Sequence, residues 1–220
     1  MARKVGAEGR VLAFEPQGFI YSLLKSNLVV NNVENVEAHY AALGATPGEV
    51  LIPMFDYAKG ENFSGYGREH WQKIPKERCF TVELLTVDQL GLTRLDLLQL
   101  DVEYMEREVL LGAQQTIAKH RPKIFLENNG GEEFGRLINY LREINYTPYW
   151  MVTFLFNKNN YFENEVDVFK GACSFNMYCV PNEREEWKVE GLREAQPTDP
   201  QGDAGGVPAQ WVVTGVEGTQ

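Results

Sequence analysis

Hydrophobic residues near the start of the chain follow the spacing of a strand, a helix and a second strand. The run Arg10–Phe14 ends at Glu15-Pro16, where proline stops a strand and can open a helix. The next apolar side chains share one face of a helix: Ile20, Leu23, Leu24 and Leu28. A second apolar run covers residues 36–42. This order predicts a parallel, right-handed crossover unit.

Between residues 46 and 80 the pattern is broken by glycine and proline, which predicts an insertion of short strands and loops. Its aromatic residues include Phe55, Tyr57, Phe63, Tyr66 and Trp71. Two interpretations stay open. The insertion lies over a ligand site, or its aromatic side chains only cover a sheet edge.

Regular periodicity returns at residue 79 and continues to residue 180. It predicts strands over 79–85, 95–100 and 122–126, of which the last two end at Asp101 and Glu127. One helix is expected through Met105, Val109, Ala113 and Ile117, and another through Phe134, Leu137, Ile138 and Leu141. The segments 149–156 and 173–180 follow each other without an obvious helix, which predicts an antiparallel pair at one edge of the sheet.

The length of 220 residues and the hydrophobic content of 44% predict one domain, residues 1–182. The segment 183–220 is first charged and then rich in glycine and proline, so we expect a disordered or loosely attached tail. No apolar run is long enough to span a membrane, and the first ten residues lack the apolar stretch of a secretory signal. We therefore expect a cytoplasmic protein.

The formal charge of −10 argues against nucleic acid and anionic lipid as partners, because both select dense Lys/Arg faces. A small-molecule substrate is expected instead. The histidines His39, His70 and His120 show no metal-ligand spacing, so no metal site is predicted from them. The cysteines Cys79, Cys173 and Cys179 form no Cys-x-x-Cys pair and are expected to be reduced.

The ends of the predicted parallel strands are the candidate ligand site, because open α/β sheets bind ligands there. The residues at these ends are Glu15, Ala41, Ala42, Asp101, Glu103, Glu127, Asn128 and Asn129. A carboxylate at such a position can accept both hydroxyls of a bound ribose, and Glu15 is placed for that role. Alternatively, Glu15 only favours the positive end of the following helix.

Several segments, taken in order, resemble one enzyme family. They are Gly9–Pro16, Leu23–Leu28, Asn35–Glu37, Ala41–Gly44, Thr86–Leu90, Leu98–Glu103, Glu106 with Val109–Ala113, and Pro122–Glu127. Asn176–Pro181 resembles a last strand found in some members. In order and spacing, the chain resembles the FkbM family of S-adenosylmethionine-dependent methyltransferases.

The resemblance implies a Rossmann-like, class I methyltransferase fold, an α/β three-layer sandwich with a mostly parallel sheet and an antiparallel edge pair. It implies methyl transfer from S-adenosylmethionine to a hydroxyl of a sugar or other small molecule. By position, Glu15-Pro16 would bind the ribose, Ala41 and Ala42 would lie near the adenine, and Asp101 would face the methionine end.

Methyl transfer from a sulfonium needs alignment, and a base only where the acceptor hydroxyl must lose its proton. Asp101, Glu103 and Glu127 are the candidates for that base or for orienting the acceptor. Alternatively, Glu103 and Glu106 only favour the first turn of a helix. A magnesium ion held by Asp101, Glu127 and Asn128 is a further alternative. A nicotinamide enzyme is a weaker one, because no Gly-x-Gly-x-x-Gly turn precedes Glu15.

Two features depart from the family pattern. The first strand and its glycine-rich cofactor loop are not found, and we expect them to precede Met1. Their absence predicts exposed sheet edges, through which the chain could form an oligomer, or a catalytically inactive domain that acts as a binding module. The second departure is Tyr104-Met105, where members of the family usually carry Gly-Ala or similar residues.

Overall fold

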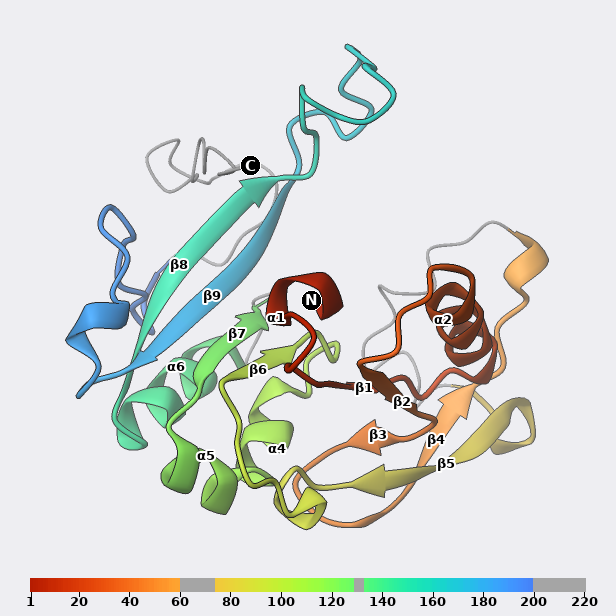
Figure 1. Cartoon of the computed structure of the whole chain (residues 1–220), viewed down its shortest axis with the longest axis horizontal. Coiled ribbons are helices and arrows are strands. Elements are labelled where there is room, and N and C mark those ends of the chain that lie inside the picture. The colour runs from red at the N-terminus through yellow and green to blue at the C-terminus, as the bar shows by residue number, and fades with distance from the viewer. Residues whose placement is uncertain (60–73, 129–132, 200–220) are drawn as a thin grey trace. The chain divides into compact units, whose positions relative to one another are not determined.

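The computed structural model describes residues 1–59, 74–128 and 133–199 (Figure 1). The chain divides into two compact units. Unit 1 contains residues 1–91 and 108–113, and unit 2 contains residues 92–107 and the chain from residue 114 onward. The boundary predicted at residue 182 stays a prediction. Each unit is described by itself.

Unit 1 begins with the predicted crossover. Its elements are α1 (Ala2–Val5), β1 (Val11–Phe14), α2 (Gly18–Val30), β2 (Val36–His39), β3 (Ala42–Leu43), β4 (Gly48–Pro53), β5 (Cys79–Leu85) and 3₁₀ turns at Tyr57–Lys59, Lys76–Arg78 and Asp88–Leu90. Strands β1 and β2 pair in parallel, with Val11 opposite Val36 and Phe14 opposite His39. The parallel strand-helix-strand unit is therefore confirmed.

The second strand of that unit is shorter than predicted. It ends at His39, and Ala42–Leu43 instead forms β3, which pairs in parallel with β5. Strand β4 pairs with the other edge of β5 in the antiparallel sense, so the order is β3-β5-β4. The predicted run 36–42 was wrong as one strand because the chain changes its pairing partner within it. The insertion contributes β4, and its Phe63, Tyr66 and Trp71 lie outside the described residues.

Unit 2 is built on one mixed sheet, in the order β6-β7-β9-β8 (Figure 1). Its elements are β6 (Leu97–Leu100), α5 (Gln114–His120), β7 (Lys123–Glu127), α6 (Glu133–Glu143), β8 (Tyr146–Phe154), β9 (Cys173–Pro181) and a 3₁₀ turn at Glu185–Trp187. Strands β6 and β7 are parallel, whereas β9 is antiparallel to both β7 and β8. The antiparallel pair at the sheet edge is confirmed.

The core of unit 2 follows the alternation of a half-buried sheet. Ile124 and Leu126 in β7 and Met177 in β9 have no exposed surface, and neither have Ile138 and Leu141 on α6. Burying an aliphatic side chain of this size contributes about 1.5–3 kcal/mol. The apolar core of unit 2 thus receives every second residue of its strands and the residues three or four positions apart on α6.

The helix predicted through Met105, Val109, Ala113 and Ile117 is two helices. Helix α4 (Glu106–Leu111) ends before Gly112, and α5 begins at Gln114. At the break, the Gly112 carbonyl accepts a hydrogen bond from the Asp88 backbone N–H at 3.0 Å. The prediction was wrong because this bond uses a carbonyl that a continuous helix would need for itself.

The described part of the expected tail, residues 183–199, is attached to β8. Tyr149 forms an antiparallel bridge with Glu194, and Ala195 has no exposed surface. The Trp150 indole N–H donates to the Asp199 carboxylate at 2.7 Å. This stretch is therefore not the loose segment that its composition predicted, whereas residues 200–220 lie outside the described residues.

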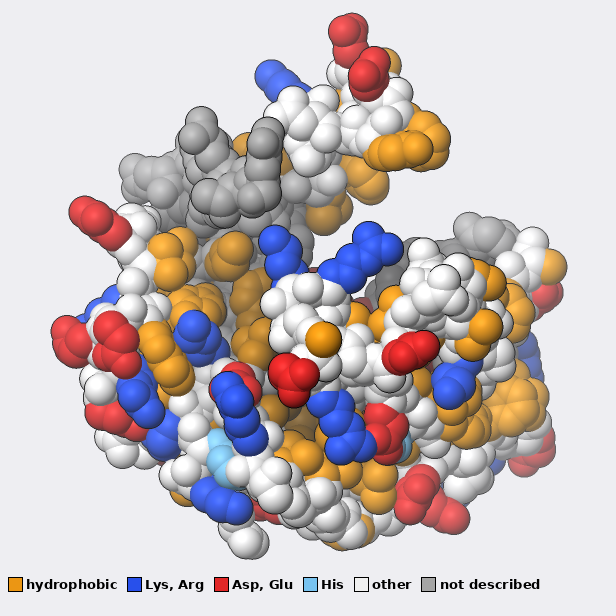
Figure 2. All heavy atoms as spheres, viewed as in Figure 1, with side chains coloured by type: hydrophobic (Ala, Val, Ile, Leu, Met, Phe, Trp, Pro, Cys, Tyr) orange, Lys and Arg blue, Asp and Glu red, His pale blue; other side chains and the backbone are white. Residues whose placement is uncertain are grey.

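The connection between β8 and β9 carries exposed apolar side chains. Tyr161 and Phe162 are 93% and 86% exposed, and Figure 2 shows hydrophobic side chains along this projecting connection, with acidic side chains at its outermost end. Among the described residues, no helix is long and apolar enough to cross a membrane. The chain as a whole is a mixed α/β protein with both parallel and antiparallel pairing, as the sequence predicts in outline.

Candidate functional site

Two acidic residues stand at the ends of neighbouring parallel strands in unit 2. Strands β6 and β7 pair with Leu100 opposite Leu126. Asp101 directly follows β6, and Glu127 is the last residue of β7. Because parallel strands end at the same edge of a sheet, the pairing register brings these two carboxylates together.

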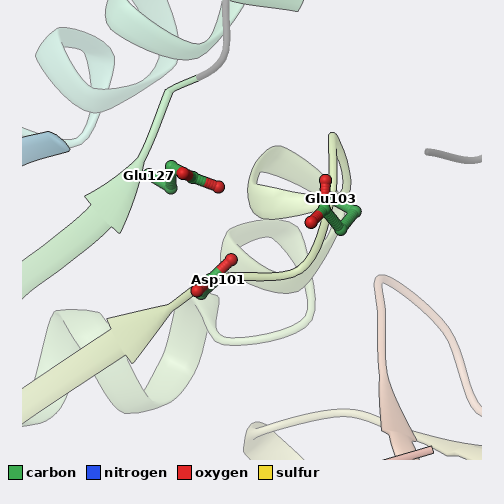
Figure 3. Close-up of side chains that lie close together, drawn as sticks. All are labelled: Asp101, Glu103 and Glu127. Carbon is green, nitrogen blue, oxygen red and sulfur yellow. The ribbon is translucent and has the colours of Figure 1, made fainter. Parts of the chain in front are cut away.

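A third carboxylate, that of Glu103, joins them from the loop that precedes α4. One carboxylate oxygen each of Asp101, Glu103 and Glu127 lies within 4.8 Å of the others, and Figure 3 shows the three side chains around a common space. Asp101 is exposed, and the other two are half-buried. The sequence prediction that these residues act together is consistent with this geometry; their catalytic role stays a prediction.

Proximity and burial change the acidity of Glu103. Burial, followed by the charges of Glu127, Asp101 and Glu106, raises its pKa from 4.5 to about 7. Like charges disfavour the ionised form, and partial desolvation acts in the same direction. A carboxylate with a pKa near neutrality is suited to accept a proton at physiological pH.

The backbone that carries Glu103 is unusual. Glu103 and Tyr104 have φ values of 50° and 69°, both in the left-handed region that favours glycine. The Met105 N–H donates to the Val102 carbonyl at 3.3 Å, which closes a four-residue turn. Positive φ at both central residues is the signature of a type I′ turn, where Asn and Gly are preferred. Such non-glycine residues cost about 1–3 kcal/mol each and cluster at functional sites.

Glu106 holds this turn, a role that the sequence analysis missed. The side chain is buried, with 6% of its surface exposed. Its carboxylate accepts backbone hydrogen bonds from Val102, Tyr104 and its own N–H, the Val102 bond being 3.4 Å long. Burial, the largest effect, raises the pKa of Glu106 to about 7. The available signal was the spacing of acids at 101, 103 and 106, interpreted only as a preference for a helix start.

Asn128 ties neighbouring strands together. It is buried, its N–H donates to the Phe175 carbonyl at 2.9 Å, and its side-chain amide contacts the Met177 sulfur at 3.5 Å. These contacts join the end of β7 to β9. Asn129, the next residue of the predicted strand end, lies outside the described residues.

In unit 1, Glu15 stands where the sequence places it, at the carboxyl end of β1. Its carboxylate accepts a hydrogen bond from the Gln17 N–H at 2.7 Å. Burial raises the pKa of Glu15, and the bond from Gln17 partly offsets this effect. An ionised carboxyl has about four acceptor positions, so the one bond that Glu15 accepts from the described residues leaves acceptor capacity for a diol.

Aromatic residues of the insertion lie beside the Glu15 turn. The Tyr57 hydroxyl donates to the Gln17 side-chain oxygen at 3.0 Å, and its ring stacks on Phe19 with centroids 4.4 Å apart. Phe55 meets the Tyr57 ring edge to face. Burial and the charge of Glu15 raise the pKa of Tyr57. Of the two interpretations of the insertion, this part favours a position next to the candidate ribose site.

The other residues predicted to bind the cofactor differ in exposure. Pro16 and Ala42 are half-buried, whereas Ala41 is only 2% exposed. Ala42 also belongs to β3. Asp101 belongs to unit 2, whereas the other four residues belong to unit 1. Cofactor binding by Asp101 therefore stays a prediction, which the family resemblance implies.

The chemistry of the acidic cluster in unit 2 is that of oxygen donors. A half-buried carboxylate next to two others can accept a proton from a hydroxyl or orient that hydroxyl by hydrogen bonds. Three converging carboxylates are also the ligand type that Mg²⁺ prefers. The alternative of a magnesium ion held by Asp101, Glu127 and Asn128 stays a prediction, because acidic groups commonly gather at a surface without binding an ion.

The fold and the placement of these carboxylates are those of α/β proteins whose ligands bind at the carboxyl ends of parallel strands. Comparison with protein families identifies the family of this chain: the family described as "Methyltransferase FkbM domain" matches residues 1–148. The match covers more than half of the chain. The chain therefore belongs to the FkbM methyltransferase family, as the sequence motifs indicate.

Among solved structures, the chain is similar to the methyltransferase FkbM from Methylobacillus flagellatus KT. The identity is 15%, the TM-score is 0.46, and the alignment covers 77% of this chain and 36% of that protein. The chain thus spans about a third of the length of that protein. No match was found among curated proteins.

Proposed function

We propose that the chain is an S-adenosylmethionine-dependent methyltransferase that methylates a hydroxyl oxygen of a small molecule such as a sugar. The observation that carries the proposal is the family match over residues 1–148. The finer fold that goes with it is the Rossmann-like three-layer sandwich of class I methyltransferases. The parallel pairs β1–β2 and β6–β7 support this arrangement.

The cofactor supplies an electrophilic methyl group on its sulfonium. The residues of unit 1 that suit it are Glu15 and Pro16, with Ala41 and Ala42. Glu15 is at a strand end, is half-buried and retains acceptor capacity, which fits the two hydroxyls of a ribose. Its bond to the Gln17 N–H fixes the orientation of the carboxylate before any ligand arrives.

Asp101, Glu103 and Glu127 act on the acceptor. A sugar hydroxyl is a poor nucleophile until its proton is accepted by a base, and a base with a pKa near the working pH performs this best. Glu103 has that property, because burial and neighbouring charges raise its pKa to about 7. Asp101 and Glu127 orient the hydroxyl by accepting further hydrogen bonds.

A labelled-methyl assay tests the proposal. The purified chain is incubated with S-adenosylmethionine carrying a radioactive methyl group and with a panel of hydroxyl-bearing metabolites, including free and nucleotide-linked sugars. The expected result is transfer of label to at least one hydroxyl compound, and its loss in the Glu103→Gln variant. Transfer only to amines or thiols would contradict the proposed acceptor, and absence of any transfer would contradict the activity.

A further inference from the structure

The strained turn over Val102–Met105 needs something to hold it. Both of its central residues have positive φ, and neither is glycine or asparagine. The Met105 N–H donates to the Val102 carbonyl across this turn at 3.3 Å. A turn of this kind would relax to an ordinary conformation unless its surroundings fixed it.

Glu106 supplies the holding contacts from the first residue of α4. The carboxylate is buried and accepts hydrogen bonds from the N–H groups of Val102 and Tyr104, which flank Glu103. Hydrogen bonds to a carboxylate are stronger than those between neutral groups. Two such bonds across one residue fix the direction in which that residue projects.

We infer that Glu106 is a positioning residue: it clamps the turn in its left-handed conformation and thereby aims the Glu103 carboxylate at Asp101 and Glu127. The inference rests on the proposed function only in that Glu103 is taken to act as the base. The clamp itself is a property of the free chain.

Asp101 and Glu127 each place a carboxylate oxygen within 4.8 Å of one from Glu103. The clamp also explains why Tyr104 is tolerated at a position whose φ of 69° favours glycine.

Amide hydrogen exchange of the full chain, measured by NMR without cofactor or acceptor, tests the clamp. In Glu106→Ala, the Val102 and Tyr104 amides are expected to exchange about tenfold faster or more, because each loses a charge-assisted bond. The Leu98 and Leu100 amides in β6 are the internal control and should change little. Glu106→Gln keeps an acceptor oxygen and should retain most of the protection.

Equal acceleration at β6 and at the turn, or loss of protection in Glu106→Gln as large as in Glu106→Ala, would overturn the inference.

A second variant keeps the test decisive if Glu106→Ala does not fold. Tyr104→Gly removes the side chain that makes positive φ costly, so the melting temperature of this variant should be unchanged or higher. A clear decrease would show that the turn is not strained. The methyl-transfer assay is independent, so its failure leaves these results intact.

Discussion

A methyl group on Gly112 would lie 2.0 Å from the carbonyl oxygen of Gly44. Both residues belong to unit 1, and both are buried. The contact lies at the point where α4 ends and where Gly112 also accepts the bond from the Asp88 N–H. Only a residue without a side chain permits this approach of two backbone segments.

Gly112→Ala is therefore expected to destabilise the fold. The neighbouring atom is backbone rather than a flexible side chain, so the segments must move apart, at a cost of about 1–3 kcal/mol in unfolding free energy. Gly48→Ala is the matched control, since no described atom lies within 4 Å of the added methyl group. Urea unfolding of both variants measures the difference. Equal midpoints would show that the close approach does not exist in solution.

The attachment of residues 183–199 predicts a role for Asp199 in stability. Its carboxylate accepts hydrogen bonds from the Trp150 indole and from the Gln196 N–H. Asp199→Ala leaves the buried indole N–H without its acceptor, which should cost about 1–3 kcal/mol. Glu190→Ala, at an exposed site in the same segment, should change stability by less than about 0.5 kcal/mol. Thermal unfolding followed by Trp fluorescence compares them. Matching curves for the two variants would argue against the attachment.

The raised pKa values of Glu103 and Glu106 predict how stability depends on pH. Each pKa is about 7 in the folded chain, against an ordinary value of 4.5. The folded state therefore binds protons more tightly, so the unfolding free energy should fall as pH rises from about 4.5 to 7. Above pH 7 both groups are ionised in both states, and their contribution becomes constant.

Glu106→Gln and Glu103→Gln should each flatten this fall to a similar extent, because both pKa values are raised from 4.5 to about 7. Urea unfolding between pH 4.5 and 8 measures the slopes of the wild type and of both variants. If the wild type and Glu106→Gln lose stability equally over this interval, Glu106 does not carry the shifted pKa.

Glu103→Gln separates binding from chemistry. If Glu103 takes the proton from the substrate hydroxyl, replacing its carboxylate by an amide should lower kcat by about 10²–10⁴-fold. The affinity for S-adenosylmethionine should stay unchanged. Glu143→Gln, an exposed acid on α6, is the control and should retain full activity. The comparison uses whichever acceptor the labelled-methyl assay identifies. An unchanged kcat would remove Glu103 from the role of base.

The sequence predicted the local elements well where periodicity is strong. The helix through Ile20 and Leu28 and the strands that end at Asp101 and Glu127 are present because their apolar spacing admits one structure. The helix break at Gly112 was not predicted, because the hydrogen bond that marks it comes from Asp88, which is distant in the sequence. The docking of Asp199 on Trp150 was missed for the same reason.

For the candidate site, the sequence identified the residues but not what holds them. Asp101 and Glu127 could be paired from the rule that parallel strands end together. The left-handed turn at Glu103 and Tyr104 could not, because neither residue type favours positive φ. The role of Glu106 in holding the turn follows from its burial and its backbone contacts, which only the folded chain shows.

Calorimetric titration of the chain with S-adenosylmethionine tests the central claim most directly. The account predicts saturable binding, weakened about tenfold or more in Glu15→Gln, because a charged acceptor for the ribose hydroxyls is lost. Glu8→Gln, at an exposed position in unit 1, should bind like the wild type. Absence of binding up to millimolar cofactor, or equal affinities for the wild type and Glu15→Gln, would contradict the account.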